Sequence, residues 1–288
     1  MKPVLLLSLA LVALGLSALP AGAAANCTIS GTAGDDVFTT EMQTDGADDI
    51  CGLGGNDVFE PSPGNDFYYG DTGRDTVDYS TVPENAGWSS WSSVIYLHPS
   101  GGTADTFSLG QDGLNRIENV VGTPFKDYVN TVNTASNRVE AGTGNDLIEF
   151  GLTGDKLYGE GGYDTLRICA GPYSTSPRVV DGGHGVDAMD GSCDASTSGA
   201  TFDFVDQTYA SFGGGFRFQS IRDGVGTQLS DTMYGNRQVN TFKGGSGDDF
   251  LDGGAGDDYL YGQSDTDYAN GRAGSDACQA EVQEFCER

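Results

Sequence analysis

An apolar residue recurs at every ninth position over much of the chain, two residues after an aspartate. The pattern is clearest in two adjacent segments near the C-terminus, GGSGDDFLD at 244–252 and GGAGDDYLY at 253–261. A short strand that points its middle side chain inward and its neighbours outward accounts for the apolar position. A fixed period of nine residues therefore predicts a stack of repeated units rather than a conventional globular sheet.

Seventeen nine-residue units follow this frame. Their eighth position is apolar or aromatic throughout, their fourth is Gly in eleven units, and their sixth is Asp in all but two, which carry Asn137 and Asn240. The units lie at 31–39, 43–78, 122–130, 132–167, 182–190 and 226–279. Each unit predicts a turn followed by a short strand, so that two consecutive units make one full coil.

The residue types of the turn point to a hard cation. Gly at positions 1, 2 and 4 permits positive φ and lets backbone carbonyls face a common point. Asp at position 6 adds an anionic oxygen, and calcium prefers six to eight oxygen ligands. An all-oxygen set indicates calcium rather than zinc or iron, which take His or Cys.

These units match the G-G-x-G-x-D-x-U-x nonapeptide, and the chain closely resembles the repeats-in-toxin (RTX) calcium-binding family. The resemblance implies an all-β fold, a parallel β-roll or short β-helix solenoid of nonapeptide repeats, with inserted β spacers. It also implies several calcium ions between turns stacked on one edge, with ligating Asp residues two units apart. The implied metal ligands are Asp36, Asp48, Asp57, Asp66, Asp75, Asp146, Asp155, Asp164, Asp187, Asp231, Asp249, Asp258, Asp267 and Asp276.

An acidic, glycine-rich linker that binds nothing is the alternative interpretation of this composition. A linker has no reason to place an apolar residue every ninth position in step with Asp, so the solenoid is favoured. The chain carries 42 acidic against 14 basic residues, a net charge of −28. Such a charge argues against nucleic acid or an anionic membrane as partner.

The N-terminal segment, 1–25, predicts a secretory signal peptide. Lys2 precedes an apolar run from 4 to 19, and small residues at 21–25 suit cleavage after Ala23 or Ala25. A membrane anchor is the alternative, but the run is shorter than the roughly 20 residues that a spanning helix needs. The sequence therefore predicts a secreted, extracellular protein with no membrane span.

Six cysteines remain after the predicted cleavage, and an even number in an oxidising compartment favours disulfides. Six cysteines allow 15 pairings. We predict that the cysteines pair in their order along the chain, the first with the second, the third with the fourth and the fifth with the sixth: Cys27–Cys51, Cys169–Cys193 and Cys278–Cys286. A bridge from Cys286 to Cys278 would fold the tail over the open end of the solenoid.

Two spacers break the repeat frame and predict six segments. After the signal peptide at 1–25 come a first array at 26–80, a β spacer at 81–121, a second array at 122–190, a β spacer at 191–225 and a third array with a disulfide-capped tail at 226–288. Segments 93–97 and 200–205 suit strands. The uninterrupted third array is predicted to be the strongest calcium segment.

No catalytic motif is found, and no stretch outside the arrays is long enough for a separate catalytic domain. The only histidines are His98 and His184, the latter inside a repeat turn. Calcium binding is thus the predicted function, and no enzyme activity is expected. The alternatives are a surface adhesin or matrix protein that binds a glycan, for example on Trp88 and Trp91, and a polysaccharide-active enzyme on the solenoid surface.

Overall fold

The computed structural model describes most of the chain after the predicted signal peptide. The described residues are 27–83, 93–97, 101–106, 109–132, 136–151, 154–169, 179–195, 197–211 and 214–287. The signal peptide, Trp88, Trp91 and His98 lie outside these ranges.

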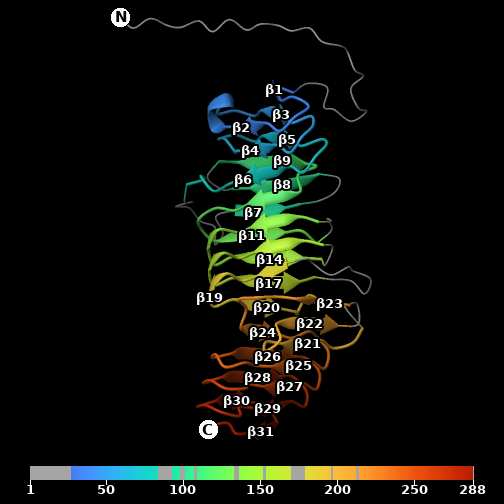
Figure 1. Ribbon diagram of the computed structural model, residues 1–288, viewed down its shortest axis with the longest axis vertical. Coiled ribbons are helices and arrows are strands. Elements are labelled where there is room, and N and C mark those ends of the chain that lie inside the picture. The colour runs from blue at the N-terminus through green and yellow to red at the C-terminus, as the bar shows by residue number, and fades with distance from the viewer. Residues whose placement is uncertain are drawn as a thin grey trace, which may run out of the picture.

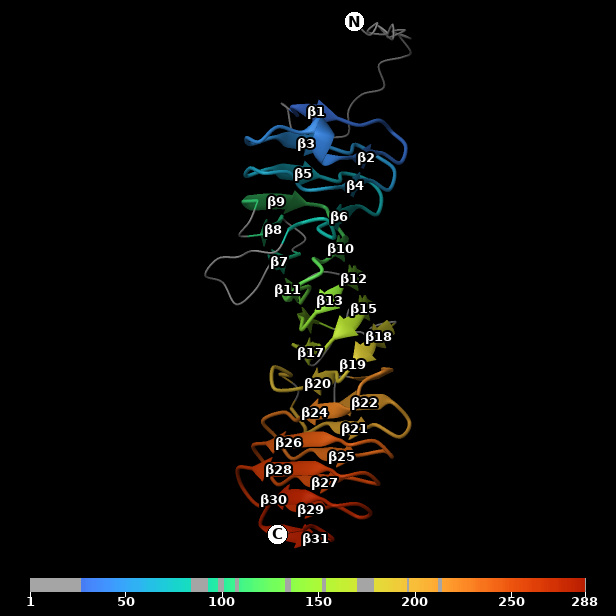
Figure 2. The same ribbon diagram turned by 90° about the vertical axis from the view of Figure 1, so that its left-hand side faces the viewer.

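The described chain winds into one rod-shaped β-solenoid with its two ends at opposite ends of the rod (Figure 1). One face is a fourteen-stranded sheet, called here the long sheet. The other face consists of two seven-stranded sheets, the N-terminal and C-terminal back sheets, which follow one another along the rod (Figure 2). This architecture confirms the predicted all-β solenoid of parallel coils.

The long sheet contains, in spatial order, β1 (Ile29–Ser30), β3 (Asp49–Cys51), β5 (Phe67–Tyr69), β9 (Gln111–Asn115), β8 (Gly102–Asp105), β7 (Ser93–Tyr96), β11 (Asp127–Asn130), β14 (Leu147–Phe150), β17 (Thr165–Ile168), β20 (Ala188–Asp190), β24 (Asp223–Val225), β26 (Thr241–Gly245), β28 (Tyr259–Gln263) and β30 (Ala277–Gln279).

The N-terminal back sheet contains, in spatial order, β18 (Val179–Asp181), β15 (Lys156–Tyr158), β12 (Arg138–Glu140), β10 (Asn119–Val121), β6 (Thr76–Asp78), β4 (Val58–Phe59) and β2 (Val37–Phe38). The C-terminal back sheet contains β23 (Gly214–Arg217), β22 (Thr208–Ser211), β21 (Thr201–Asp203), β25 (Thr232–Tyr234), β27 (Phe250–Asp252), β29 (Tyr268–Asn270) and β31 (Val282–Glu284). A three-stranded sheet of β13 (Thr143–Gly144), β16 (Gly161–Gly162) and β19 (His184–Gly185) and a 3-10 turn at Thr40–Met42 complete the described elements.

The strand register confirms the predicted coil length. Phe242 of β26 pairs with Leu260 of β28, and Leu260 pairs with Cys278 of β30, each two repeat units further along the chain. The position-8 side chains form the core: Phe242 and Leu260 are fully buried, and Cys278 packs against the same core. Burial of one such large apolar side chain stabilises a fold by about 1.5–3 kcal/mol, so the ninth-residue pattern drives the stacking.

The first spacer adds two strands to the long sheet alone. The chain leaves β6 and returns as the antiparallel meander β7–β8–β9, in which β9 pairs with β5 and β7 pairs with β11. On the opposite face, β10 pairs directly with β6 and β12. The long sheet therefore gains two strands that the N-terminal back sheet does not have.

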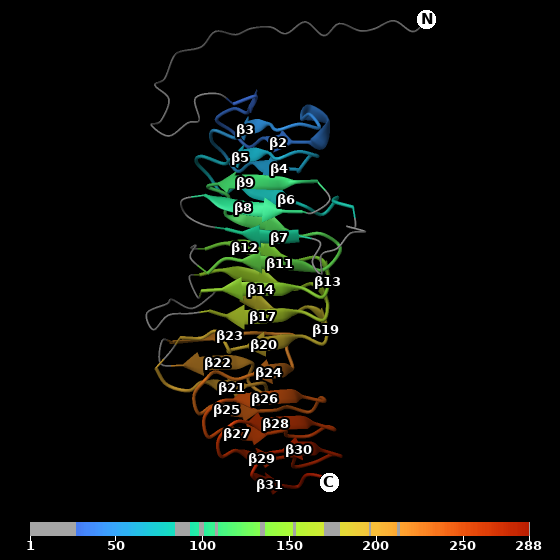
Figure 3. The ribbon, with the colours of Figure 1, turned by 180° about the vertical axis from the view of Figure 1, so that it is seen from behind.

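The second spacer adds two strands to the C-terminal back sheet and none to the long sheet. Its meander β21–β22–β23 joins the C-terminal back sheet, where β21 pairs with β25 (Figure 3). On the long sheet, β24 pairs directly with β20 and β26. Because strands are spaced by about 4.8 Å, each insertion lengthens one face by about 10 Å. The two insertions lie on opposite faces and compensate, so both faces carry fourteen strands.

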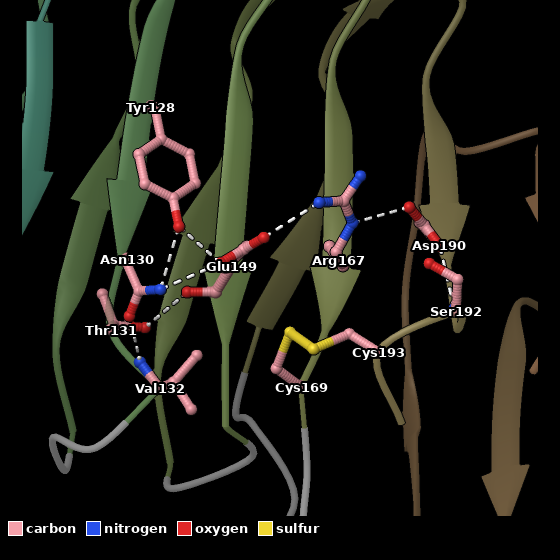
Figure 4. The surroundings of a disulfide bond; sticks show 10 residues. All are labelled: Tyr128, Asn130, Thr131, Val132, Glu149, Arg167, Cys169, Asp190, Ser192 and Cys193. Carbon is pink, nitrogen blue, oxygen red and sulfur yellow. Dashed lines mark hydrogen bonds and ion pairs between the residues drawn. A yellow bond between two sulfur atoms is a disulfide. The ribbon is translucent and has the colours of Figure 1, made fainter. Parts of the chain in front are cut away.

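Three disulfides have the predicted sequential pairing. They join Cys27 to Cys51, Cys169 to Cys193, and Cys278 to Cys286. The second lies beside an outward-facing polar ladder on the long sheet (Figure 4). In that ladder Arg167 donates to Glu149 on one side and Asp190 on the other, at 2.9 and 2.7 Å, and so links three successive strands.

Among the described residues, no helix is long and apolar enough to cross a membrane.

Candidate metal-binding turns

The predicted site residues lie in two columns that run along the rod. One column precedes the strands of the long sheet, and the other precedes the strands of the back sheets. The first contains Asp48, Asp66, Asp146, Asp164, Asp187, Asp258 and Asp276; the second contains Asp36, Asp57, Asp75, Asp155, Asp231, Asp249 and Asp267.

A ladder of hydrogen bonds joins neighbours within each column. The main-chain N–H of Asp249 donates to Oδ1 of Asp267 at 3.0 Å, and the N–H of Asp258 donates to Oδ1 of Asp276 at 2.9 Å. Every predicted Asp pair with an 18-residue separation makes this contact. The aspartates are therefore brought together one coil apart, as the spacing predicts. Most of their side chains are buried.

Four acidic residues that were not among the predicted ligands also join the columns. Asp127, the sixth residue of its unit, donates its N–H to Asp146 Oδ1 at 2.7 Å. Asp112 accepts from the N–H of Asp66. Glu118 accepts from the N–H of Asp75, and Glu281 accepts from the N–H of Asp267. Gly110-Gln-Asp112-Gly-Leu114 carries the G-x-D-x-apolar signal within the first spacer and could have been found there. The glutamates carry no such signal.

Nine of the aspartates hold a carboxylate oxygen that is buried and has no hydrogen-bond partner. The oxygen is Oδ2 in each of them, and Oδ1 is taken up by the ladder. These residues are Asp57, Asp75, Asp146, Asp164, Asp187, Asp249, Asp258, Asp267 and Asp276. In each of their turns the residue at position 2 has a positive φ; these residues are Leu53, Asp71, Gly142, Glu160, Gly183, Gly245, Gly254, Gln263 and Arg272. We call these nine turns open.

Five other turns satisfy their own carboxylate, and we call them closed. A Thr or Ser at position 2 donates its hydroxyl, and in four of the five also its N–H, to the Asp at position 6. Thr227, for example, places its N–H 2.6 Å and its hydroxyl 3.1 Å from Asp231 Oδ2. None of these five Thr and Ser residues has a positive φ. The pairs are Thr32–Asp36, Thr44–Asp48, Ser62–Asp66, Thr123–Asp127 and Thr227–Asp231.

Asp155 belongs to neither group. Its Oδ1 accepts from both the N–H and the side-chain amide of Asn137, and its Oδ2 accepts from the hydroxyl of Thr131 at 3.3 Å. Thr131 lies before residues 150–158, the unit that contains Asp155. The hydroxyl that bonds to the Asp155 carboxylate therefore comes from an earlier coil and not from position 2 of the same turn.

The glycines of an open turn lie close both to the unpartnered carboxylate and to backbone carbonyls of the preceding coil. A β-carbon on Gly253 would fall 2.5 Å from Asp258 Oδ2, so glycine at position 1 leaves room for the carboxylate in this turn. At the next residue, Gly254, the carbonyl oxygens of Asn236 and Gly235 lie 2.5 and 2.8 Å from where a β-carbon would be. The open turn therefore brings carbonyls of one coil close to the backbone of the next.

Burial makes the charged state of the open carboxylates costly. Burial, with a smaller contribution from neighbouring carboxylates, raises the pKa of Asp164 and Asp249 to about 7 and that of Asp146 to about 9. The closed turns differ among themselves: the N–H of Thr44 lowers the pKa of Asp48, whereas burial raises that of Asp127 to about 6. A cation beside the open carboxylates would remove the cost that burial imposes on them.

The donor set fits calcium. Within the described ranges, no three His, Cys, Asp or Glu side chains gather into a metal-binding cluster, so a cation here needs backbone oxygens as well as carboxylates. Calcium accepts carbonyl and carboxylate oxygens together in flexible geometry. A buried carboxylate oxygen without a partner costs free energy, and such a ligand would offset that cost.

A parallel solenoid whose turns carry stacked, buried aspartates is the class of protein that fold and site define. A comparison with family models matches the RTX calcium-binding nonapeptide repeat (4 copies) at residues 28–59, 42–77, 132–166, 225–260 and 243–277. The chain belongs to this family, as its repeats predict. A comparison with curated proteins found no match.

Proposed function

We propose that this protein is a secreted calcium-binding solenoid, in which calcium held between stacked turns folds and rigidifies the rod. The observation that carries the proposal is the set of nine buried Oδ2 atoms without a hydrogen-bond partner. They recur along the columns, and all but Asp187 lie within the segments that the family repeat matches. The residues that would hold the ions are these aspartates and the turn carbonyls beside them.

Charge explains why the fold would depend on the ion. The chain has a net charge of −28, and its aspartates face one another in columns. Self-repulsion and desolvation both oppose stacking until a cation neutralises the carboxylates. The three disulfides support an oxidising, extracellular location, where calcium modules typically bind with Kd of about 10⁻⁴–10⁻³ M.

The same burial supports a binding and structural role rather than catalysis. The stacked aspartates of the ladder, which are the densest acidic pairs of the chain, are buried away from solvent and so are poorly placed to act as a general acid and base in glycan cleavage. A substrate cannot reach them without opening a coil. We therefore assign no catalytic residue.

Circular dichroism and thermal unfolding of the purified protein, during titration of metal-free samples with calcium, test the proposal. We expect a gain of β signal and a large rise in Tm at millimolar calcium. Magnesium should act poorly, because it keeps its waters and demands a tight octahedral shell. Identical spectra and identical Tm with EDTA and with calcium would contradict the proposal.

A further inference from the structure

The open and closed turns are not scattered but ordered along each column. The open turns form four runs, and the first open aspartate of every run accepts a hydrogen bond from the turn one coil earlier. That earlier turn is closed in three runs, at Asp36, Asp127 and Asp231. In the fourth run it contains Asn240, whose side-chain oxygen accepts from the N–H of Asn236 at position 2. Each run therefore begins on a turn whose sixth residue is already hydrogen-bonded within the turn.

The closed turns offer calcium less than the open ones. In a closed turn the Asp Oδ2 accepts an N–H or a hydroxyl hydrogen of the position-2 residue, and in three of the five turns it accepts both. These hydrogens compete with a cation for the same oxygen. The position-2 residue also lacks the positive φ seen in all nine open turns. Binding calcium there would require breaking these bonds and reversing the backbone conformation.

We propose that the residue at position 2 decides whether a turn takes calcium, and that the five Thr- and Ser-closed turns are calcium-independent. This inference rests on the proposed calcium function and narrows the predicted ligand set to the nine open aspartates. Closed turns keep their geometry without metal and give three of the four runs a preformed coil on which the calcium-dependent coils stack; in the fourth run the Asn240 turn takes this place.

The order of open and closed turns along the columns also predicts how many calcium ions the chain binds. Five ladder hydrogen bonds join one open turn to another, in the pairs 57–75, 146–164, 164–187, 249–267 and 258–276. A gap with an open turn on each side presents two unpartnered carboxylate oxygens, whereas a gap next to a closed turn presents one. We therefore assign five calcium ions to the chain, one for each of these gaps.

Two substitutions exchange the turn classes. Gly254→Thr changes GGAGDD at 253–258 into GTAGDD, the hexapeptide that forms the closed turn at 31–36. Thr32→Gly makes the reverse change. Native mass spectrometry of the calcium-loaded, full-length secreted protein should count five ions in the wild type, four in Gly254→Thr and six in Thr32→Gly. Gln263→Thr in the open turn at 262–267 should also count four, and Gln263→Asn is its matched control: this position already holds a side chain at positive φ, and Asn tolerates that conformation, so the control should keep five.

The outcomes separate the inference from the function on which it rests. A wild-type protein that binds no calcium contradicts the proposed function. A wild-type protein that binds calcium, with the same count in Gly254→Thr and Thr32→Gly, overturns only the role of position 2. Because a β-carbon at Gly254 would lie too close to two carbonyl oxygens and Gly254→Thr could fail to fold, Gln263→Thr and Thr32→Gly provide independent counts. Loss of an ion in Gln263→Asn would show that the count does not depend on the hydroxyl that closes the turn and would also overturn the inference.

Discussion

Two turns at opposite ends of the rod differ by a single residue and have different structures. The N-terminal turn, GTAGDD at 31–36, is closed: Thr32 donates its N–H at 2.6 Å and its hydroxyl at 3.0 Å to Asp36 Oδ2. The C-terminal turn, GGAGDD at 253–258, is open: Gly254 has a φ of 89° and Asp258 Oδ2 is buried without a partner. The single difference between the two turns, Thr32 against Gly254, thus decides whether the Asp carboxylate is hydrogen-bonded within the turn or keeps an unpartnered oxygen.

The comparison teaches that a repeat motif defines the coil but not its chemistry. Both turns place an apolar residue, Phe38 or Leu260, in the same core. Both also belong to the ladder, since Asp36 donates its N–H to Asp57 and Asp258 donates its N–H to Asp276. Core packing and the ladder therefore do not require calcium chemistry, and the turn can vary while the coil remains.

The largest effect that would test this comparison is the pH dependence of the metal-free protein. Burial raises the pKa of Asp164 and Asp249 to about 7 and that of Asp258 to about 6. In the unfolded chain these groups titrate near 3.9, so the folded state binds more protons between these values. The contribution of these groups to metal-free stability should therefore be greatest at or below about pH 4 and fall as pH rises to about 7, by up to about 1.4 kcal/mol per group and pH unit.

Thermal unfolding of metal-free protein from pH 5 to 8 measures this trend, at high constant salt so that surface repulsion is screened. With saturating calcium the direction should reverse, because the ion needs ionised carboxylates. Asp48 acts in the opposite sense, because the N–H of Thr44 lowers its pKa, whereas burial raises the pKa of the closed-turn residues Asp127 and Asp231 as it does in the open turns. A metal-free Tm that rises from pH 5 to 8 would show that burial does not raise the pKa of the open carboxylates.

A pair of conservative substitutions at the two compared turns should act with opposite signs. Asp258→Asn removes a buried, unpaired charge, so it should stabilise the metal-free protein by about 1 kcal/mol and weaken calcium binding about tenfold. Asp36→Asn weakens the charge-assisted bonds from Thr32, so it should destabilise by about 1 kcal/mol with calcium affinity unchanged. Asn240 shows that the turn accepts an amide at position 6.

Urea unfolding of both variants with and without calcium, together with calcium titration, measures the two signs. Equal losses of calcium affinity in the two variants would remove the distinction between the turns. Destabilisation of metal-free Asp258→Asn would show that the Asp258 carboxylate is stabilising even without a cation.

Much of the fold follows from the nonapeptide frame, because its signals are local. The ninth-residue apolar position predicts the buried core that contains Leu251 and Leu260. The 18-residue spacing predicts the ladder contact between Asp249 and Asp267. The spacers could not be predicted in this way. Their strands run antiparallel and pair with coils that lie far away in the sequence, so no period marks the position of β9 next to β5.

The candidate site was predictable in its residues but not in its two classes. The sequence itself shows a threonine at position 2 in four of the closed turns: Thr32, Thr44, Thr123 and Thr227. Their importance depends on where the N–H and hydroxyl point, which is a property of φ at that residue rather than of composition. Glu118 and Glu281 enter the columns because shortened turns bring them there, and the nonapeptide motif does not include Glu at this position.

The smallest expected effect concerns backbone strain at position 2. Gln263 is exposed and has a φ of 82°, a conformation that costs a residue with a β-carbon about 1–2 kcal/mol. Gln263→Gly should relieve that cost, offset in part by unfolded-state entropy, and stabilise the calcium-loaded protein by about 0.5–1 kcal/mol. The matched control is Gln228→Gly in the closed turn at 226–231, where an exposed residue without positive φ should lose about 0.5–1 kcal/mol. Thermal unfolding of both variants in calcium measures the two effects. If Gln263→Gly lost as much stability as Gln228→Gly, the left-handed backbone at position 2 would carry no cost. The angle φ alone would then not separate the open turns from the closed ones.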